Sequence, residues 1–239
     1  KRMNGRTDDN PGAWRARLRH AIDDAPDRYD LAIAKSGVAV PVRRDDGRAV
    51  FSRYDPRREA ERWLAGQPLP PEALPVLLGY NPSIIAACPR RPLVVVEEDR
   101  SLLRALLDRD DVPPPPEGVL IVVGEDEEEL TGTLRAAFDL FVHREIRILR
   151  APHIENDAWA RDMTAVALTM QREVSLNAIT IASQSQAWMR AMAENLPAAM
   201  TAPDAGALGG CLDGETAIIV AAGPSGAAPL SITSGYKVP

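Results

Sequence analysis

The sequence predicts an α/β fold: a Rossmann-like, mostly parallel sheet, preceded by a small N-terminal β meander and followed by a helical C-terminal connector. Between residues 71 and 150, short apolar runs that lack polar alternation are separated by segments with helical spacing. This order is typical of a parallel sheet covered by helices on both faces. Before it, short strand-like runs are joined by turn residues, and after it apolar residues recur at helical intervals.

Residues 1–70 are expected to form a helix and then the β meander. The helix is predicted over 13–22, where Trp14, Leu18 and Ile22 share one face. Strands are predicted at 31–34, 38–42 and 49–52, because turn residues separate these runs. A further helix is expected to begin at Asp55-Pro56 and to end at Gly66.

The Rossmann-like region is assigned to residues 71–150. Its predicted elements alternate strand and helix, as a doubly wound sheet requires. The strands are expected at 76–79, 93–97, 119–123 and 146–149, and the helices at 82–87, 100–107 and 127–141.

Residues 151–207 form the expected helical connector. Two or three helices are predicted between 155 and 200, with breaks near Asn177 and Ser183 and a stop at 195–197. Residues 208–239 are expected to supply the first strand, at 215–220, and the Gly-Pro-Ser loop of a nucleotide-binding domain whose remaining elements are absent from the chain.

Composition excludes several classes of function. The formal net charge is −6 and the pI about 5.2, which argues against general affinity for nucleic acid or anionic membranes. Cys88 and Cys211 lie far apart in sequence and outside any metal-binding motif. No apolar run has the length of a membrane span, and the polar start lacks a signal-peptide core, so a cytoplasmic protein is expected.

Gly79 and Glu97 have the spacing of a cofactor-binding edge. In doubly wound proteins the loop after the first strand faces the cofactor, and an acid about 20 residues later binds its ribose. The loop after Gly79 lacks further glycines, so a structural sheet edge remains the alternative to a vestigial site for a nucleotide or S-adenosylmethionine. No metal site is predicted, because the acidic run at 125–129 occupies a helix start and the histidines lack ligand spacing.

The loop formed by Gly223, Pro224 and Ser225 is the stronger candidate for phosphate binding. An apolar run ends there, the glycines permit close approach, and backbone amides and the Ser225 hydroxyl can donate to an anion. A plain strand-to-loop turn is the alternative. The nucleophile elbow of serine hydrolases is not matched, because Ala222 stands at its first glycine position.

Several motifs together resemble the motility-associated factor family of bacterial flagellin glycosyltransferases. They are Gln186-Ala187-Trp188, Asn195-Leu196-Pro197 and the run from 217 to 225 that ends in Gly-Pro-Ser, together with the segments 49–60 and 94–97. The resemblance spans most of the chain. Its most specific element is the order of the Trp, Asn-Leu-Pro and Ala-Gly-Pro-Ser motifs.

The resemblance implies transfer of a nonulosonic acid, of the pseudaminic or legionaminic type, from its CMP-activated form to Ser or Thr of flagellin. Gly223, Pro224 and Ser225 would contact the phosphate of this donor, and no other cofactor is implied. The residues after Ser225 depart from the family, and the general base lies in a part of the family domain that this chain lacks. The chain alone is therefore expected to be inactive. The alternatives are a flagellin-binding or partner-binding module without catalysis and a relative of archaeal pterin diphosphokinases, which share the loop.

Overall fold

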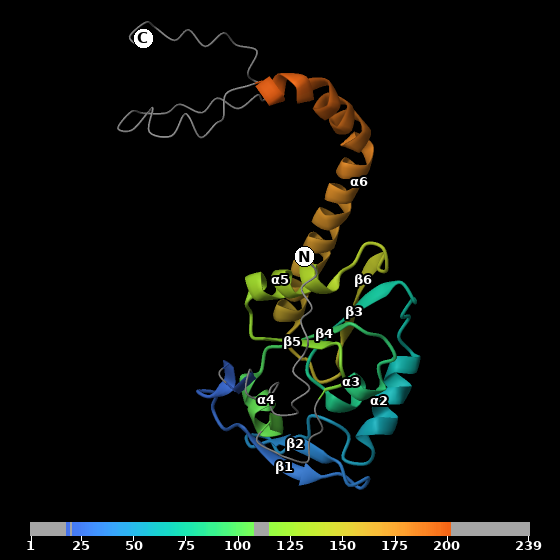
Figure 1. The fold of residues 1–239 in the computed structure, drawn as a ribbon. Helices are drawn as coiled ribbons and strands as arrows, with labels where there is room; N and C mark the ends of the chain where they lie inside the picture. The colour runs from blue at the N-terminus through green and yellow to red at the C-terminus, as the bar shows by residue number, and fades with distance from the viewer. Residues whose placement is uncertain (1–17, 20, 108–114, 202–239) are drawn as a thin grey trace, which may run out of the picture. The chain divides into compact units, whose positions relative to one another are not determined.

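Four parallel strands form the sheet that the sequence predicts, in a computed structural model that describes residues 18–19, 21–107 and 115–201 (Figure 1). The strands are β3 (Ala73–Leu78), β4 (Leu93–Glu97), β5 (Val119–Val123) and β6 (Glu145–Arg150). Their order in the sheet is β5-β4-β3-β6. The chain therefore moves outward from β3 to β5 and then returns to the other side of β3. The predicted α/β, Rossmann-like fold class is confirmed.

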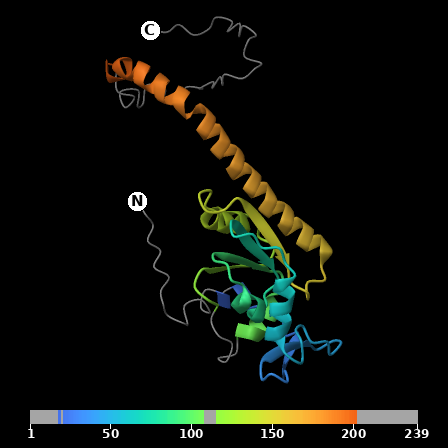
Figure 2. The ribbon, with the colours of Figure 1, turned by 90° about the vertical axis from the view of Figure 1, so that its right-hand side faces the viewer.

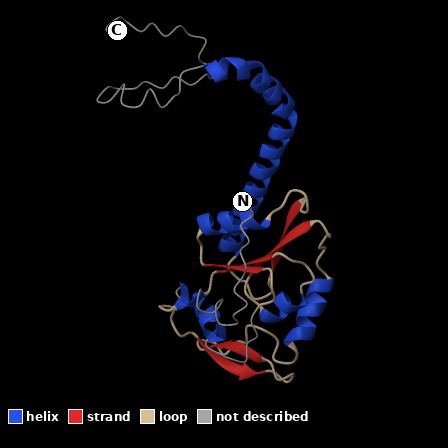
Figure 3. Ribbon diagram, viewed as in Figure 1, coloured by secondary structure: helices blue, strands red, loops and turns tan. Residues whose placement is uncertain are grey.

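The sheet is covered on both faces. The helices α3 (Pro82–Ala87) and α4 (Arg100–Leu107) lie on one face, while α5 (Glu127–Ala137) and the beginning of α6 lie on the other (Figures 1 and 3). Every residue of β3 and β4 is buried as a result. This double burial explains why these strands are apolar runs without alternation.

Side-chain caps fix two of the predicted helix starts. Asn81 accepts from the amides of Ser83 and Ile84 at the start of α3. Asp126 accepts from the amide of Glu129 at the start of α5, so the acidic run begins a helix as predicted. The helix α5 ends at Ala137, earlier than the predicted residue 141, because Phe138 is extended and its amide closes the last turn.

The N-terminal meander is smaller than predicted. The strands β1 (Tyr29–Ile33) and β2 (Ala39–Arg43) form an antiparallel hairpin. The prediction of a third strand at 49–52 is wrong. This segment forms an isolated bridge between Val42 and Ala49 and no strand. The chain leaves the ladder because the amide of Ser52 donates to the carboxylate of Glu59 instead. Glu59 belongs to α2 (Pro56–Ala65), which has the predicted Asp55 and Gly66 caps.

The helix α6 (Asp157–Thr201) corrects the prediction of two or three helices, because its 45 residues form one uninterrupted helix (Figure 2). Polar residues near the predicted breaks bond back to the preceding turn, as Thr180 Oγ1 does to the carbonyl of Leu176. Pro197 lies inside the helix. It removes one backbone donor, but the alanines on both sides are strong helix formers that sustain the flanking turns.

The chain divides into two compact units, residues 1–181 and 182–239. The predicted helix at 13–22 falls largely outside the described residues, and the predicted strand at 215–220 lies wholly outside them. None of the helices in the described part of the chain combines the length and apolar character needed to cross a membrane.

Candidate functional site

The loops at the carboxyl ends of β3, β4 and β6 meet at one edge of the sheet, beside the point where the strand order reverses. Ligands of doubly wound proteins bind in this position. The structure brings the two residues of the predicted cofactor edge together here. Glu97 is fully buried, and its carboxylate accepts from the amide of Tyr80 at 2.6 Å and from the amide of Asp99 at 2.8 Å. Both of its oxygens are thus bonded to the protein backbone.

Gly79 is held in a backbone conformation that favours glycine, with φ of +99°. A Cβ atom at this position would lie 2.6 Å from Cγ1 of Ile154 and 3.0 Å from Cβ of Ala151. The close approach that glycine permits is therefore used by the loop that follows β6. In a dinucleotide-binding protein the pyrophosphate approaches the backbone at the equivalent place.

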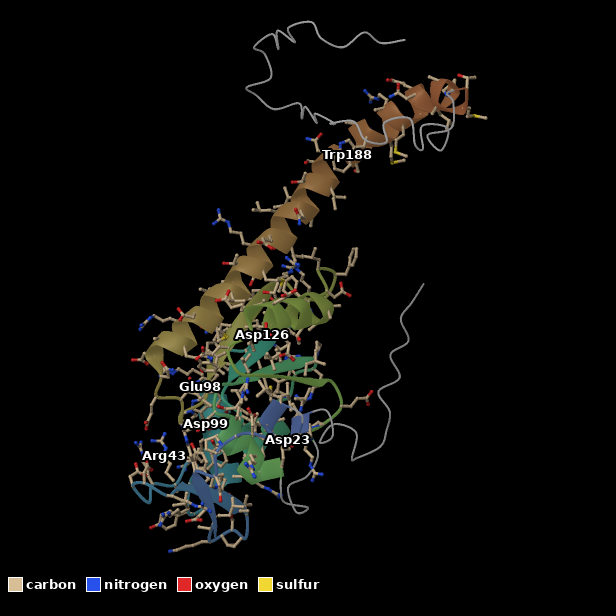
Figure 4. All side chains as sticks on the ribbon, turned by 90° about the vertical axis from the view of Figure 1, so that its left-hand side faces the viewer. Asp23, Arg43, Glu98, Asp99, Asp126 and Trp188 are labelled. Carbon is tan, nitrogen blue, oxygen red and sulfur yellow. The ribbon has the colours of Figure 1, made fainter. Side chains whose placement is uncertain are left out.

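The N-terminal hairpin and the segment after it contact the same edge. The Tyr29 hydroxyl donates to the Asp99 carboxylate at 2.6 Å. The ring of Phe51 meets the ring of His153 edge-on, with 5.4 Å between their centroids. Arg43 binds Glu155, with 3.2 Å between Nη1 and Oε2. The hairpin therefore lies over the carboxyl ends of the strands, and Figure 4 labels Arg43, Glu98 and Asp99 at this end of the α/β region.

Two cavities remain at this contact, and Arg43 lines both. The larger has a volume of about 650 Å³ and is lined by Asp27, Arg28, Tyr29, Arg43, Arg44, Asp45 and Asp99. The smaller, of about 250 Å³, is lined by Phe51, Ser52 and His153 among others. Three arginines and three aspartates are among the residues that line the larger cavity, so it suits a small polar molecule that carries both signs of charge.

Burial and charge perturb two groups at the edge. Burial raises the pKa of Tyr29 well above its usual range, and the carboxylate of Asp99 raises it further by accepting from the hydroxyl. Burial also raises the pKa of Glu98, together with the negative charges of Glu97, Asp99 and Glu125; the hydrogen bond from Asn156 opposes this rise. The surroundings of the sheet edge thus favour the neutral form of Tyr29 and disfavour the ionised form of Glu98.

The side chain of His153 is 8% exposed, and the sequence spacing of the histidines did not point to it. Its Nε2 lies 3.8 Å from Oε2 of Glu97, and neither ring nitrogen has a hydrogen-bond partner. Glu97, Phe51 and His153 lie far apart in sequence, so no local motif indicates this cluster. The signal available in the sequence was that His153 follows the predicted strand at 146–149.

The residues predicted to bind the donor phosphate, Gly223, Pro224 and Ser225, lie outside the described residues. Within residues 18–19, 21–107 and 115–201, the histidine, cysteine and acidic side chains form no group of three that could hold a metal ion. Cys88 is a free, buried thiol.

Comparison of the chain with models of protein families finds no match. The curated proteins likewise contain no match to it. No solved structure matches it either.

Proposed function

We propose that this chain serves the transfer of a CMP-activated nonulosonic acid to Ser or Thr hydroxyls of flagellin in the cytoplasm. In this proposal the loop of Gly223, Pro224 and Ser225 contacts the donor phosphate, where amides and a hydroxyl would stabilise the leaving group. The α/β region is a module without catalytic chemistry of its own, and it binds the acceptor protein. The support for the substrate comes from the sequence motifs that resemble the motility-associated factor family.

The non-catalytic role is supported by one observation: groups of the protein itself occupy the edge of the sheet where a cofactor would bind. Both oxygens of Glu97 are bonded to backbone amides, the side chain of Ile154 lies against Gly79, and Tyr29 of the hairpin is bonded to Asp99. A ribose-binding acid needs a carboxylate oxygen free for the ligand, and a cofactor needs open backbone beside the glycine. Here neither requirement is met, because backbone amides occupy both oxygens of Glu97 and Ile154 covers Gly79. This arrangement favours a scaffold over a second nucleotide site.

A binding experiment tests the acceptor role. The chain is immobilised and offered purified, unmodified flagellin monomer, with an unrelated acidic protein of similar size as the control. We expect flagellin to be retained and the control to pass. Equal retention of both proteins, or of neither, would overturn the acceptor role.

A transfer assay tests the non-catalytic assignment separately. The chain is incubated with flagellin and CMP-pseudaminic acid, and the flagellin mass is measured. We expect no added nonulosonic acid, and a mass gain would contradict the assignment. Calorimetry with CMP, ATP and a hydroxymethylpterin distinguishes the donor classes: heat with CMP alone supports the proposal, whereas heat with ATP and the pterin favours a diphosphokinase relative.

A further inference from the structure

The first turns of α6 and its last 20 residues each have an apolar face. An α-helix turns by about 100° per residue, so residues separated by 4, 7 or 11 positions share a face. Trp159, Met163 and Met170 are buried on this face at the start of the helix. Within residues 182–201, the spacing of four positions places Trp188, Met192 and Leu196 on one face of the helix.

In residues 182–201 this face is uncovered. The side chains are 49% exposed at Trp188, 72% at Met192 and 57% at Leu196. The neighbouring Met189 and Met200 are also exposed. We call these five residues, Trp188, Met189, Met192, Leu196 and Met200, the distal stripe. Contiguous exposed apolar residues of this kind mark a binding surface, and three flexible methionines allow it to adapt to its partner.

The charges of this segment lie away from the distal stripe. Between residues 182 and 201 the charged residues are Arg190 and Glu194. The helical repeat places both on the side opposite Trp188 and Met192. A strongly charged partner therefore finds no complementary group on the stripe, and the fitting occupant is an uncharged apolar segment.

We propose that the distal stripe is the docking surface for the apolar run at 216–222 of the same chain. This run, Thr-Ala-Ile-Ile-Val-Ala-Ala, has no charged residue. The inference is independent of the proposed function.

The length of the intervening chain permits this docking. Residues 202–214 can span about 40 Å when extended. The helix between Met189 and Thr201 is about 18 Å long. The run at 216–222 can therefore return to any part of the distal stripe. The region in between is rich in Gly, Pro and Ala, which suits a connecting segment.

Methionine oxidation in the full chain tests the proposal. Dilute peroxide converts exposed methionines to sulfoxides, and peptide mass spectrometry resolves each site. We expect Ile218→Asp to increase the oxidation rates of Met189 and Met192 several-fold, because a carboxylate would expel the run from the stripe. Ala227→Asp, which adds the same charge outside the run, is the matched control and should leave both rates unchanged. Equal rates in the original chain and in Ile218→Asp would overturn the proposal.

Two further readouts keep the result interpretable. Met163 and Met170 are buried against the sheet and should stay protected in every variant, which shows that the fold is intact. In the reciprocal variant, Met192→Asp, hydrogen exchange of the peptide covering 216–222 should accelerate. If a second copy covers the stripe instead, protection will depend on protein concentration and persist in Ile218→Asp, which would also overturn the proposal.

Discussion

The hydroxyl of Tyr29 donates to the carboxylate of Asp99 at 2.6 Å and so joins β1 to the loop after β4, across 70 residues of sequence. Tyr29 is buried, and Asp99 also accepts from the amides of Ser101 and Leu102 at the start of α4. One carboxylate therefore holds the hairpin and begins a helix. This contact places the hairpin over the edge of the sheet.

Tyr29→Phe should lower the free energy of unfolding by about 1–2 kcal/mol, because it removes a hydrogen bond to a charged acceptor and keeps the ring. Urea denaturation at neutral pH measures the change. Tyr54→Phe is the matched control, since Tyr54 is 67% exposed and should cost little. Equal effects of the two substitutions would show that the contact with Asp99 does not stabilise the fold.

Stability should fall in alkaline solution through the same residue. The pKa of Tyr29 is raised above its ordinary value of 10.0 in the folded chain, so the folded state holds this proton more tightly than the unfolded state. The contribution is fully present below pH about 10 and is lost as the pH rises above it. Tyr29→Phe should flatten the decline between pH 9 and 11, as followed by urea denaturation. An unchanged slope in the variant would refute this assignment.

Gly79→Ala should destabilise the protein by about 2–4 kcal/mol, because the new Cβ atom meets Ile154 and the backbone conformation is unfavourable for alanine. Gly124→Ala is the matched control: its φ is +94°, but the nearest atom is the end of the Arg100 side chain, 3.6 Å away. It should show the conformational cost alone. Thermal unfolding of both variants separates the steric contact with Ile154 from the cost of the backbone conformation. Equal losses of stability would mean that the Ile154 side chain moves aside at no cost.

Glu98→Gln should stabilise the protein at neutral pH by less than about 1 kcal/mol, a value that allows for solvent screening. The pKa of Glu98 is raised in the folded chain, so its ionised form is disfavoured there and stability is lost as the pH rises through this carboxyl's range. Glutamine keeps an acceptor for Asn156. The gain should vanish below pH about 4, where the carboxyl is protonated in both states. Thermal unfolding at both pH values, with the exposed Glu61→Gln as control, checks this; a loss of stability at pH 7 would contradict it.

The sequence by itself determined the elements whose signals are local. The apolar runs of β4 and β5 and the caps of α2 and α5 are encoded within a few residues of each element. Prediction failed where a residue that usually interrupts a strand or a helix was tolerated because of its neighbours. Pro75 was expected to lie outside any strand, yet it is part of β3, whose pairing with β4 begins only at Val76. Polar residues and Pro197 did not interrupt α6, because flanking helix formers sustain its turns.

Only the tertiary structure decided what occupies the sheet edge. The spacing of Gly79 and Glu97 predicted that the two lie near each other. It did not show that Ile154 packs against Gly79 or that Tyr80 and Asp99 donate to Glu97. Helical and strand periodicity report which side of an element is buried, whereas these contacts join loops that follow different strands. The loop that fills a crevice is selected by packing among residues far apart in sequence, which no local pattern records.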